Sequence, residues 1–182
     1  QKGFTLVEIA IVLVIIGLLL GGILKGQEMI VQAKIKNAIT DFSGISAAYH
    51  GYADRYRAVP GDDLNAATRW AGAVAGSGNG QVQGPYNSAV PADESRKWWD
   101  HLRRSGFVAG SGDVQPFNAL AGMVGVQTGD AAAAPAATLF DVATTGTGLS
   151  GLIVCTANLP DKVAIALDTQ MDDGFAGKGT VR

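Results

Sequence analysis

One segment constrains this chain more than any other: residues 4–24 are apolar except for a few small or polar residues and one charge, Glu8. As a helix, these residues would extend about 31 Å, enough to cross the hydrocarbon core of a bilayer. A cleaved secretory signal has a shorter apolar region, followed by a small-x-small cleavage site. A buried helix of a soluble protein rarely runs so long without a polar face. The segment therefore predicts a membrane-spanning helix.

Glu8 is the anomalous residue of this segment. A carboxylate inside an apolar span is costly unless a cation neutralises it, so Glu8 is a functional candidate. Alternatively, it lies at the headgroup boundary and is solvated. If it is paired, the best available cation is the free amino terminus of a neighbouring chain, because the segment has no Lys or Arg. Lys2 and Lys25 flank the two ends, so the positive-inside rule is nearly balanced, and an orientation with the N-terminus inside is the simpler expectation.

The residues around Glu8 form a specific motif, which reads Lys2-Gly3-Phe4-Thr5-Leu6-Val7-Glu8 and precedes the apolar run. It closely resembles the processing site and N-terminal helix of type IV pilins and pseudopilins. The resemblance implies that a dedicated peptidase cuts between Gly3 and Phe4 and that the new N-terminal Phe4 is N-methylated. It also implies that Phe4, Thr5 and Glu8 act in assembly. Glu8 would pair with the amino group of Phe4 in an adjacent subunit and set the axial stagger.

Two features depart from the pattern of that family. Residues 1–3 would be a leader remnant or an N-terminal extension, which processing would remove. Many members also carry a proline late in the apolar half, where this chain has Lys25. Four glycines could make the helix flexible there instead, or could serve only for close helix packing in the membrane. They are Gly17, Gly21, Gly22 and Gly26.

An amphipathic pattern continues the helix beyond the apolar segment. Apolar and aromatic residues recur at three- and four-residue spacing from Ile35 to Tyr56, and Pro60-Gly61 ends the pattern. The predicted fold is α+β, the pilin fold: one long N-terminal α-helix, with a head of short helices and an antiparallel β-sheet. Residues 4–25 would form a transmembrane and filament-core half, residues 26–57 an amphipathic half packed on the head, and residues 58–182 the globular head.

Shorter patterns divide the head. We expect helices at residues 64–75, 91–106 and 160–169, and strands at residues 120–126, 138–142 and 149–156. In the second helix Trp98 and Leu102 should face inward, and Asp93 is a candidate N-cap. The same helix carries a basic cluster, which is a solvated face, a subunit contact or a weak DNA-binding patch. Its members are Arg96, Lys97, Arg103 and Arg104.

An acidic cluster follows the third predicted helix. Asp168, Asp172 and Asp173 precede a glycine, and carboxylates of this kind suit a hard cation such as calcium. The spacing does not fit an EF-hand loop, and solvated acids at a helix end explain the cluster equally well. By the resemblance, calcium near the C-terminus of some pilin-like heads replaces a disulfide. Cys155 is the one cysteine of this chain, so no intrachain disulfide can form.

Composition and motifs argue against catalysis. His50 and His101 have no spacing that suggests a metal site or a triad, and Cys155 lies in an apolar strand pattern. The sequence has no Rossmann, P-loop or nucleophile-elbow motif. A net charge of −2 excludes a strongly basic nucleic-acid binder.

The sequence therefore predicts a structural subunit, not an enzyme, that polymerises into a type IV pilus-like filament. It would be held in the bacterial inner membrane before assembly and would end on the cell surface. By the resemblance, its partners are further copies of itself, a prepilin peptidase, the inner-membrane assembly machinery and, before assembly, lipid. No cofactor is required, calcium being the one candidate. Three alternatives stay open: a type II secretion pseudopilin, a minor pilin with a DNA- or surface-binding role, and a membrane-anchored periplasmic binding domain.

Overall fold

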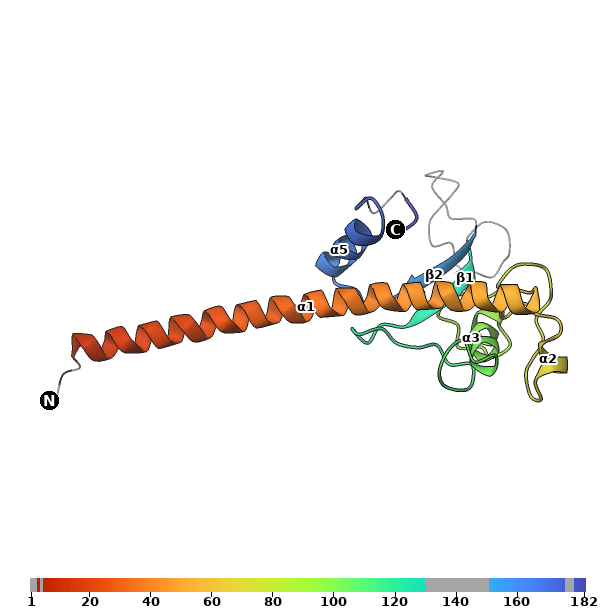
Figure 1. The fold of residues 1–182 in the computed structure, drawn as a ribbon, viewed down its shortest axis with the longest axis horizontal. Helices are drawn as coiled ribbons and strands as arrows, with labels where there is room; N and C mark the ends of the chain where they lie inside the picture. The colour runs from red at the N-terminus through yellow and green to blue at the C-terminus, as the bar shows by residue number, and fades with distance from the viewer. Residues whose placement is uncertain (1–2, 4, 130–150, 176–178) are drawn as a thin grey trace.

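One helix dominates the structure (Figure 1), a computed structural model that describes residues 3, 5–129, 151–175 and 179–182. The helix α1 (Leu6–Tyr56) has 51 residues and no break, a length of about 77 Å. It ends where Arg57 adopts a left-handed conformation with φ 54° and donates its N–H to the carbonyl of Ala53. The predicted continuous helix, which joins the apolar and the amphipathic segment, is confirmed.

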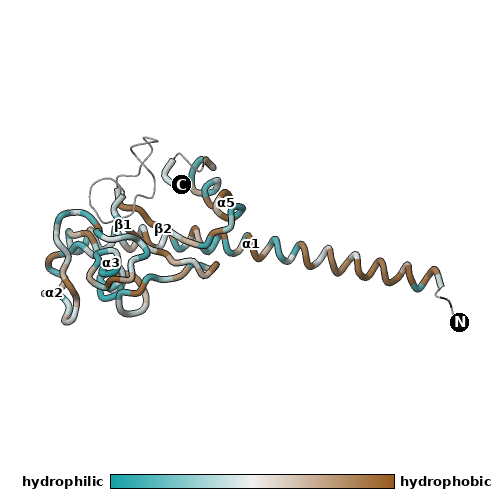
Figure 2. Tube along the Cα trace, turned by 180° about the vertical axis from the view of Figure 1, so that it is seen from behind, coloured by the Kyte–Doolittle hydropathy of each residue, from teal (hydrophilic) through white to brown (hydrophobic). Residues whose placement is uncertain are grey.

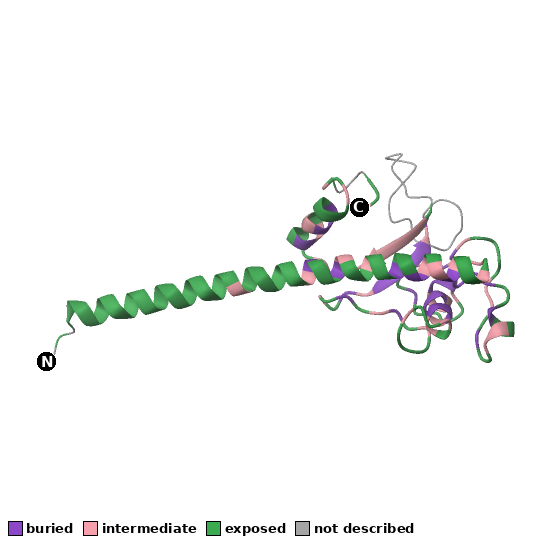
Figure 3. Cartoon of the chain, viewed as in Figure 1, coloured by how far each residue is buried: buried purple, intermediate pink, exposed green. Residues whose placement is uncertain are grey.

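The two halves of α1 differ in what covers them. Residues 6–33 are exposed except for Gly26, which is partly covered, and this half is also the apolar one (Figures 2 and 3). From residue 35 onward the helix lies against the head, and one side of it is buried because apolar residues recur there at helical spacing. These buried residues are Ile35, Ala38, Ile45, Ala48 and Tyr52.

The head combines short helices with a small sheet, which confirms the predicted α+β class. Its helices are α2 (Ala66–Arg69), α3 (Glu94–Arg104) and α5 (Asp161–Met171). The strands β1 (Val124–Thr128) and β2 (Leu152–Thr156) pair antiparallel. Val124 lies opposite Thr156, and Thr128 lies opposite Leu152. The sheet and α3 lie beside the last turns of α1, and α5 lies beside its middle (Figure 1).

Two apolar clusters fasten the head to α1. The larger one surrounds the fully buried Tyr52, Trp98, Trp99 and Leu102 and includes Val126 of β1. The burial of Trp98 and Leu102 confirms that these residues face inward from α3. Tyr49 and Tyr56 of α1 pack against this cluster, and Tyr49 stacks on Trp98 with the ring centroids 5.5 Å apart.

The smaller cluster holds α5 against the middle of α1. Val163 and Leu167, one turn apart on α5, pack with Ile35 and Ala38 of α1. This contact covers only one side of α5. Its helix runs from Asp161 to Met171, close to the expected residues 160–169.

Some predicted boundaries in the head were wrong. The helix expected at residues 64–75 stops at Arg69, because Trp70 takes an extended conformation and sets its ring edge-on to Tyr56 at 5.3 Å. The strand expected at residues 120–126 begins only at Val124. The preceding residues form a turn instead, in which Asn118 Oδ1 accepts the N–H groups of Leu120 and Gly122.

The remaining predictions for the head concern two strands and one helix. The strand expected at residues 149–156 is β2, shortened to Leu152–Thr156. The helix expected at residues 91–106 is α3, shortened to Glu94–Arg104. Asp93 does occupy its N-cap, without a side-chain hydrogen bond to the helix. The strand expected at residues 138–142 lies outside the described residues.

Candidate assembly site

The first turn of α1 is closed by a reciprocal pair of contacts between Thr5 and Glu8. The Thr5 N–H and the Thr5 hydroxyl both donate to Glu8 Oε2, at 2.8 Å each. In return, the Glu8 N–H donates to Thr5 Oγ1 at 3.3 Å. This is a capping box, and it satisfies two N–H groups that have no partner inside the helix.

The capping box leaves part of the Glu8 carboxylate free. Both donors from Thr5 go to Oε2, and Oε1 has no hydrogen-bond partner among the described residues. The negative charge also lies at the positive end of the helix dipole, where it is stabilised. The structure therefore places Thr5 and Glu8 in contact, and the role of these two residues in assembly stays a prediction. Phe4 lies outside the described residues, so its pairing with Glu8 stays a prediction.

The helix behind this cap is long and apolar enough to cross a membrane, and it is the one such helix in the part of the chain that the structure describes. Its most apolar window is not buried anywhere in the head, unlike the core helix of a soluble protein. The four glycines lie inside the continuous helix, and a side chain added at any of them would meet no atom within 4 Å. A role of these glycines in flexibility stays a prediction.

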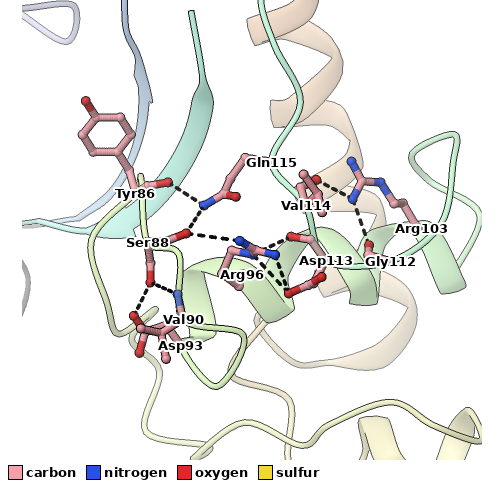
Figure 4. A network of polar contacts seen from close by, with 10 residues as sticks. All are labelled: Tyr86, Ser88, Val90, Asp93, Arg96, Arg103, Gly112, Asp113, Val114 and Gln115. Carbon is pink, nitrogen blue, oxygen red and sulfur yellow. Dashed lines mark hydrogen bonds and ion pairs between the residues drawn. The ribbon is translucent and has the colours of Figure 1, made fainter.

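Two arginines of the basic cluster of α3, Arg96 and Arg103, bind the loop that follows the helix (Figure 4). Arg96 pairs with the carboxylate of Asp113 at 2.8 Å. Arg103 donates to the carbonyls of Gly112 and Val114, at 2.8 and 2.7 Å. Both arginines thus hold the loop that follows α3 against the helix.

The other two basic side chains of α3 hold the loop after α2. Arg104 pairs with Asp100 at 2.6 Å and donates to the carbonyl of Ala71 at 2.8 Å. Lys97 Nζ donates to the carbonyl of Ala75 at 3.1 Å. Each of the four cations therefore has a partner in the head, although Arg104 is still exposed and the other three are only half-buried. A contact with DNA or with another subunit stays a prediction.

The acidic cluster does come together at the end of α5. One carboxylate oxygen from each of Asp168, Asp172 and Asp173 lies within 4.8 Å of the others. Asp172 also anchors the C-terminal segment, since its Oδ2 accepts the N–H groups of Thr180 and Val181. These donors hold the pKa of Asp172 below its usual range. Calcium binding at these three acids stays a prediction.

Three buried acids of the head anchor its loops through contacts that the sequence did not indicate. Asp62 accepts three backbone N–H groups, from Gly78, Asn79 and Gly80, at 2.5 to 3.1 Å. Glu94 accepts those of Ser77 and Gln83. In the sequence, the turn at Pro60-Gly61-Asp62-Asp63 and the glycine-rich stretch after it indicate a loop. They do not show which side chains bind that loop.

Asp63 is the third buried acid. Its carboxylate accepts the Tyr52 hydroxyl at 2.7 Å, pairs with Arg69 and accepts the N–H of Asn65 at 2.8 Å. Burial alone would raise the pKa of Asp63, but these three donors outweigh it and lower the pKa below its usual range. Burial beside this carboxylate in turn raises the pKa of Tyr52. The three acids stabilise the loops of the head and expose no reactive group.

Three further residues are candidates for chemistry: His50, His101 and Cys155. His101 is fully buried, and both of its ring nitrogens have backbone partners, Gly61 and Val74. Burial raises the pKa of the Cys155 thiol to about 12, so the thiol is a poor nucleophile near neutral pH. His50 lies exposed on α1.

These observations define a class of protein. Its members have a long N-terminal helix whose first, apolar half is exposed in the single chain and whose second half carries a small α+β head. Comparison with known families agrees at the N-terminus: residues 1–24 match the family model described as the prokaryotic N-terminal methylation motif. This motif and the long apolar helix fit a type IV pilin or pseudopilin, a kind of subunit that is processed by a prepilin peptidase and assembles into a polymer. The same comparisons found no matching curated protein and no matching solved structure.

Proposed function

We propose that the chain is the repeating subunit of a type IV pilus-like filament, assembled on the cell surface from precursors stored in the inner membrane. One observation carries the proposal: the apolar half of α1 is exposed along its whole length. Exposed apolar surface of this extent needs a cover. Lipid covers it before assembly, and the same helices of other copies cover it in the filament.

The gain on assembly comes from packing rather than from leaving water, because lipid is as apolar as the helix it surrounds. Glycines on the apolar half allow helices to approach closely. The contacts are heterologous, so that each copy adds to the last and a fibre grows. Pairing of Glu8 with the amino group of Phe4 in an adjacent subunit would fix the stagger between copies.

The experiment that tests this function is the intact mass of the chain in a sheared, sedimentable fraction from native cells. We expect a dominant species that begins at Phe4 and carries one extra methyl group. A chain found only in membranes, but also beginning at Phe4, would favour a pseudopilin of type II secretion. A membrane-bound chain that keeps Gly3 would contradict processing and favour a simple anchored domain.

A further inference from the structure

The loop at residues 76–80 carries the one Asn-Gly pair of the sequence, Asn79-Gly80. Both residues are exposed. An Asn-Gly pair is chemically labile, because glycine has no Cβ that would keep its backbone nitrogen away from the preceding side chain. In an unrestrained chain this nitrogen attacks Cγ of the asparagine. Sequence and exposure alone would therefore mark Asn79 for modification.

The reaction begins when the Gly80 nitrogen loses its proton to hydroxide. The nitrogen then forms a bond to Cγ of Asn79, and the bond from Cγ to the side-chain nitrogen breaks, so that ammonia leaves with a proton taken from water. The product is a cyclic imide. Water adds to one of its two carbonyl carbons and opens the ring, which leaves aspartate or isoaspartate. The net change is the gain of water and the loss of ammonia, and no oxidant or reductant takes part.

The structure opposes the first step through the buried side chain of Asp62. The Gly80 N–H donates to Asp62 Oδ2 at 2.6 Å, and the Asn79 N–H donates to Oδ1 of the same carboxylate at 3.1 Å. Asp62 itself is only 4% exposed. A hydrogen-bonded proton is shielded from hydroxide, and a carboxylate beside the nitrogen disfavours the amide anion by charge repulsion. Asp62 therefore suppresses the nucleophile.

The group that would be attacked is restrained as well. Asn79 Oδ1 accepts the N–H of Gln81 at 2.9 Å, which holds the side chain in an Asx turn. On the other side of Asn79, the Gly78 N–H and the Ser77 hydroxyl donate to Asp62 Oδ1, at 2.5 and 2.9 Å. Ring closure brings Cγ of Asn79 to bonding distance of the next backbone nitrogen, and these contacts resist that movement.

We propose that Asn79 is a latent deamidation site, which Asp62 keeps intact while the loop is closed and which reacts when the loop opens. The proposal does not depend on polymerisation. The rate of modification is the rate in the open loop multiplied by the fraction of time that the loop is open. Modification also opposes reclosure, because aspartate adds a negative charge next to the N–H that binds Asp62, and isoaspartate adds a carbon atom to the backbone. Loop opening is thus recorded in the covalent structure.

The full chain in detergent, incubated at mildly alkaline pH, tests the proposal. Mass spectrometry of the peptide that contains residues 77–81 follows the gain of water and loss of ammonia, and an isoaspartate-specific methyltransferase detects the isomer. The folded chain should react at least about tenfold more slowly than the same chain unfolded in guanidinium chloride. Asn79→Gln should abolish the signal, because its larger ring closes far more slowly. Equal rates in the folded and unfolded chains would overturn the proposal.

Substitution of Asp62 separates its role from that of folding in general. Asp62→Asn should raise the rate at Asn79 by about tenfold, because an amide is a weaker acceptor than a carboxylate for the N–H groups of the loop. Tryptophan fluorescence checks that the variant is folded. The matched control Asp113→Asn changes a carboxylate that binds Arg96 instead, and it should leave the rate unchanged. A folded Asp62→Asn chain that keeps the parent rate would contradict the role of Asp62.

Amide hydrogen exchange in the parent chain supplies a second measurement, which does not require the Asp62→Asn variant to fold. The Gly80 N–H should exchange at least about tenfold more slowly than in the unfolded chain, because exchange and deamidation need the same opening. A Gly80 N–H that exchanges at the unfolded rate would overturn the proposal. Neither outcome affects the proposed filament.

Discussion

Glu8 carries the single charge of the apolar segment, and one of its two carboxylate oxygens is already bound to Thr5. The residue can therefore act in two ways: through the capping box of its own helix, or through its charge on a neighbouring amino terminus. A glutamine can still accept the Thr5 N–H and keep the box. It cannot neutralise an ammonium group. The two roles are thus separable by substitution.

We expect Glu8→Ala and Glu8→Gln to insert into the membrane normally and to assemble poorly, because both lack the charge that pairs with the next chain. The measurement is filament yield in the sheared fraction, with membrane content of the same chain as the control for insertion. Wild-type yield from Glu8→Ala would refute the pairing. Normal yield from Glu8→Gln alone would assign Glu8 to the capping box instead.

At the scale of elements, one buried side chain joins α3 to the loop that follows α1. His101 Nδ1 accepts the N–H of Gly61 at 2.9 Å, which requires that nitrogen to be unprotonated. Its Nε2 lies 2.9 Å from the carbonyl of Val74 and donates to it. Burial lowers the pKa of His101, against the opposing effects of the Val74 carbonyl and of Asp63 and Asp100; Lys97 lowers it further. The tie between α3 and the loop is therefore made by a neutral imidazole.

This tie makes stability depend on pH in a defined direction. The pKa of His101 is lower in the folded than in the unfolded chain, so the unfolded chain binds the proton first as pH falls. The free energy of unfolding should be highest above about pH 6.5 and should fall below it. One proton accounts for at most about 1.4 kcal/mol per pH unit. Urea unfolding of the full chain in detergent between pH 5 and 8 measures the slope.

The control for this slope is the second histidine. His50→Gln, on the exposed side of α1, should keep the wild-type dependence on pH. His101→Gln should be less stable, by roughly 1–3 kcal/mol for a buried group that loses a hydrogen bond, and should lose most of the slope over this range. Equal slopes for the His101→Gln chain and the parent would show that another group is responsible.

The sequence predicts elements well where one period dominates and poorly where distant contacts decide. The 51 residues of α1 follow from apolar spacing alone. The end of α2 does not, because it depends on Trp70 reaching Tyr56 across the core. The same holds for the site: Thr5 and Glu8 are local and visible as a motif, whereas the cage of amides around Asp62 forms only once residues 78–80 return to it.

The partners of the basic cluster could not be predicted from the sequence for the same physical reason. Four cations on one short helix suggest a charged face, and helical spacing gives no hint of partners elsewhere in the chain. Their partners are loop carbonyls and acids that the fold delivers, such as Asp113 for Arg96 and Ala71 for Arg104. A contact with a loop that lies far away in the sequence produces no periodic pattern, so the sequence alone does not predict it.

At the scale of the whole molecule, the chain consists of a rod that carries a head at one end, and the two apolar clusters begin only at Ile35. Residues 6–24 contribute no side chain to either cluster. The stability of the head should therefore be independent of the half that enters the membrane or the filament. This separation would let the head keep the same structure in the membrane-bound subunit and in the assembled filament.

A pair of truncations tests this separation. A chain that begins at Gly26 should be soluble without detergent and should unfold within about 1 kcal/mol of the full chain, because every described residue that it loses is exposed. A chain that begins at Asp41 also loses Ile35 and Ala38, against which α5 packs, and its free energy of unfolding should fall by several kcal/mol. Urea unfolding followed by tryptophan fluorescence compares them, since Trp98 and Trp99 lie in the larger cluster. A large loss of stability in the Gly26 chain would mean that the apolar half of α1 supports the head, and that the head must change when the subunit leaves the membrane.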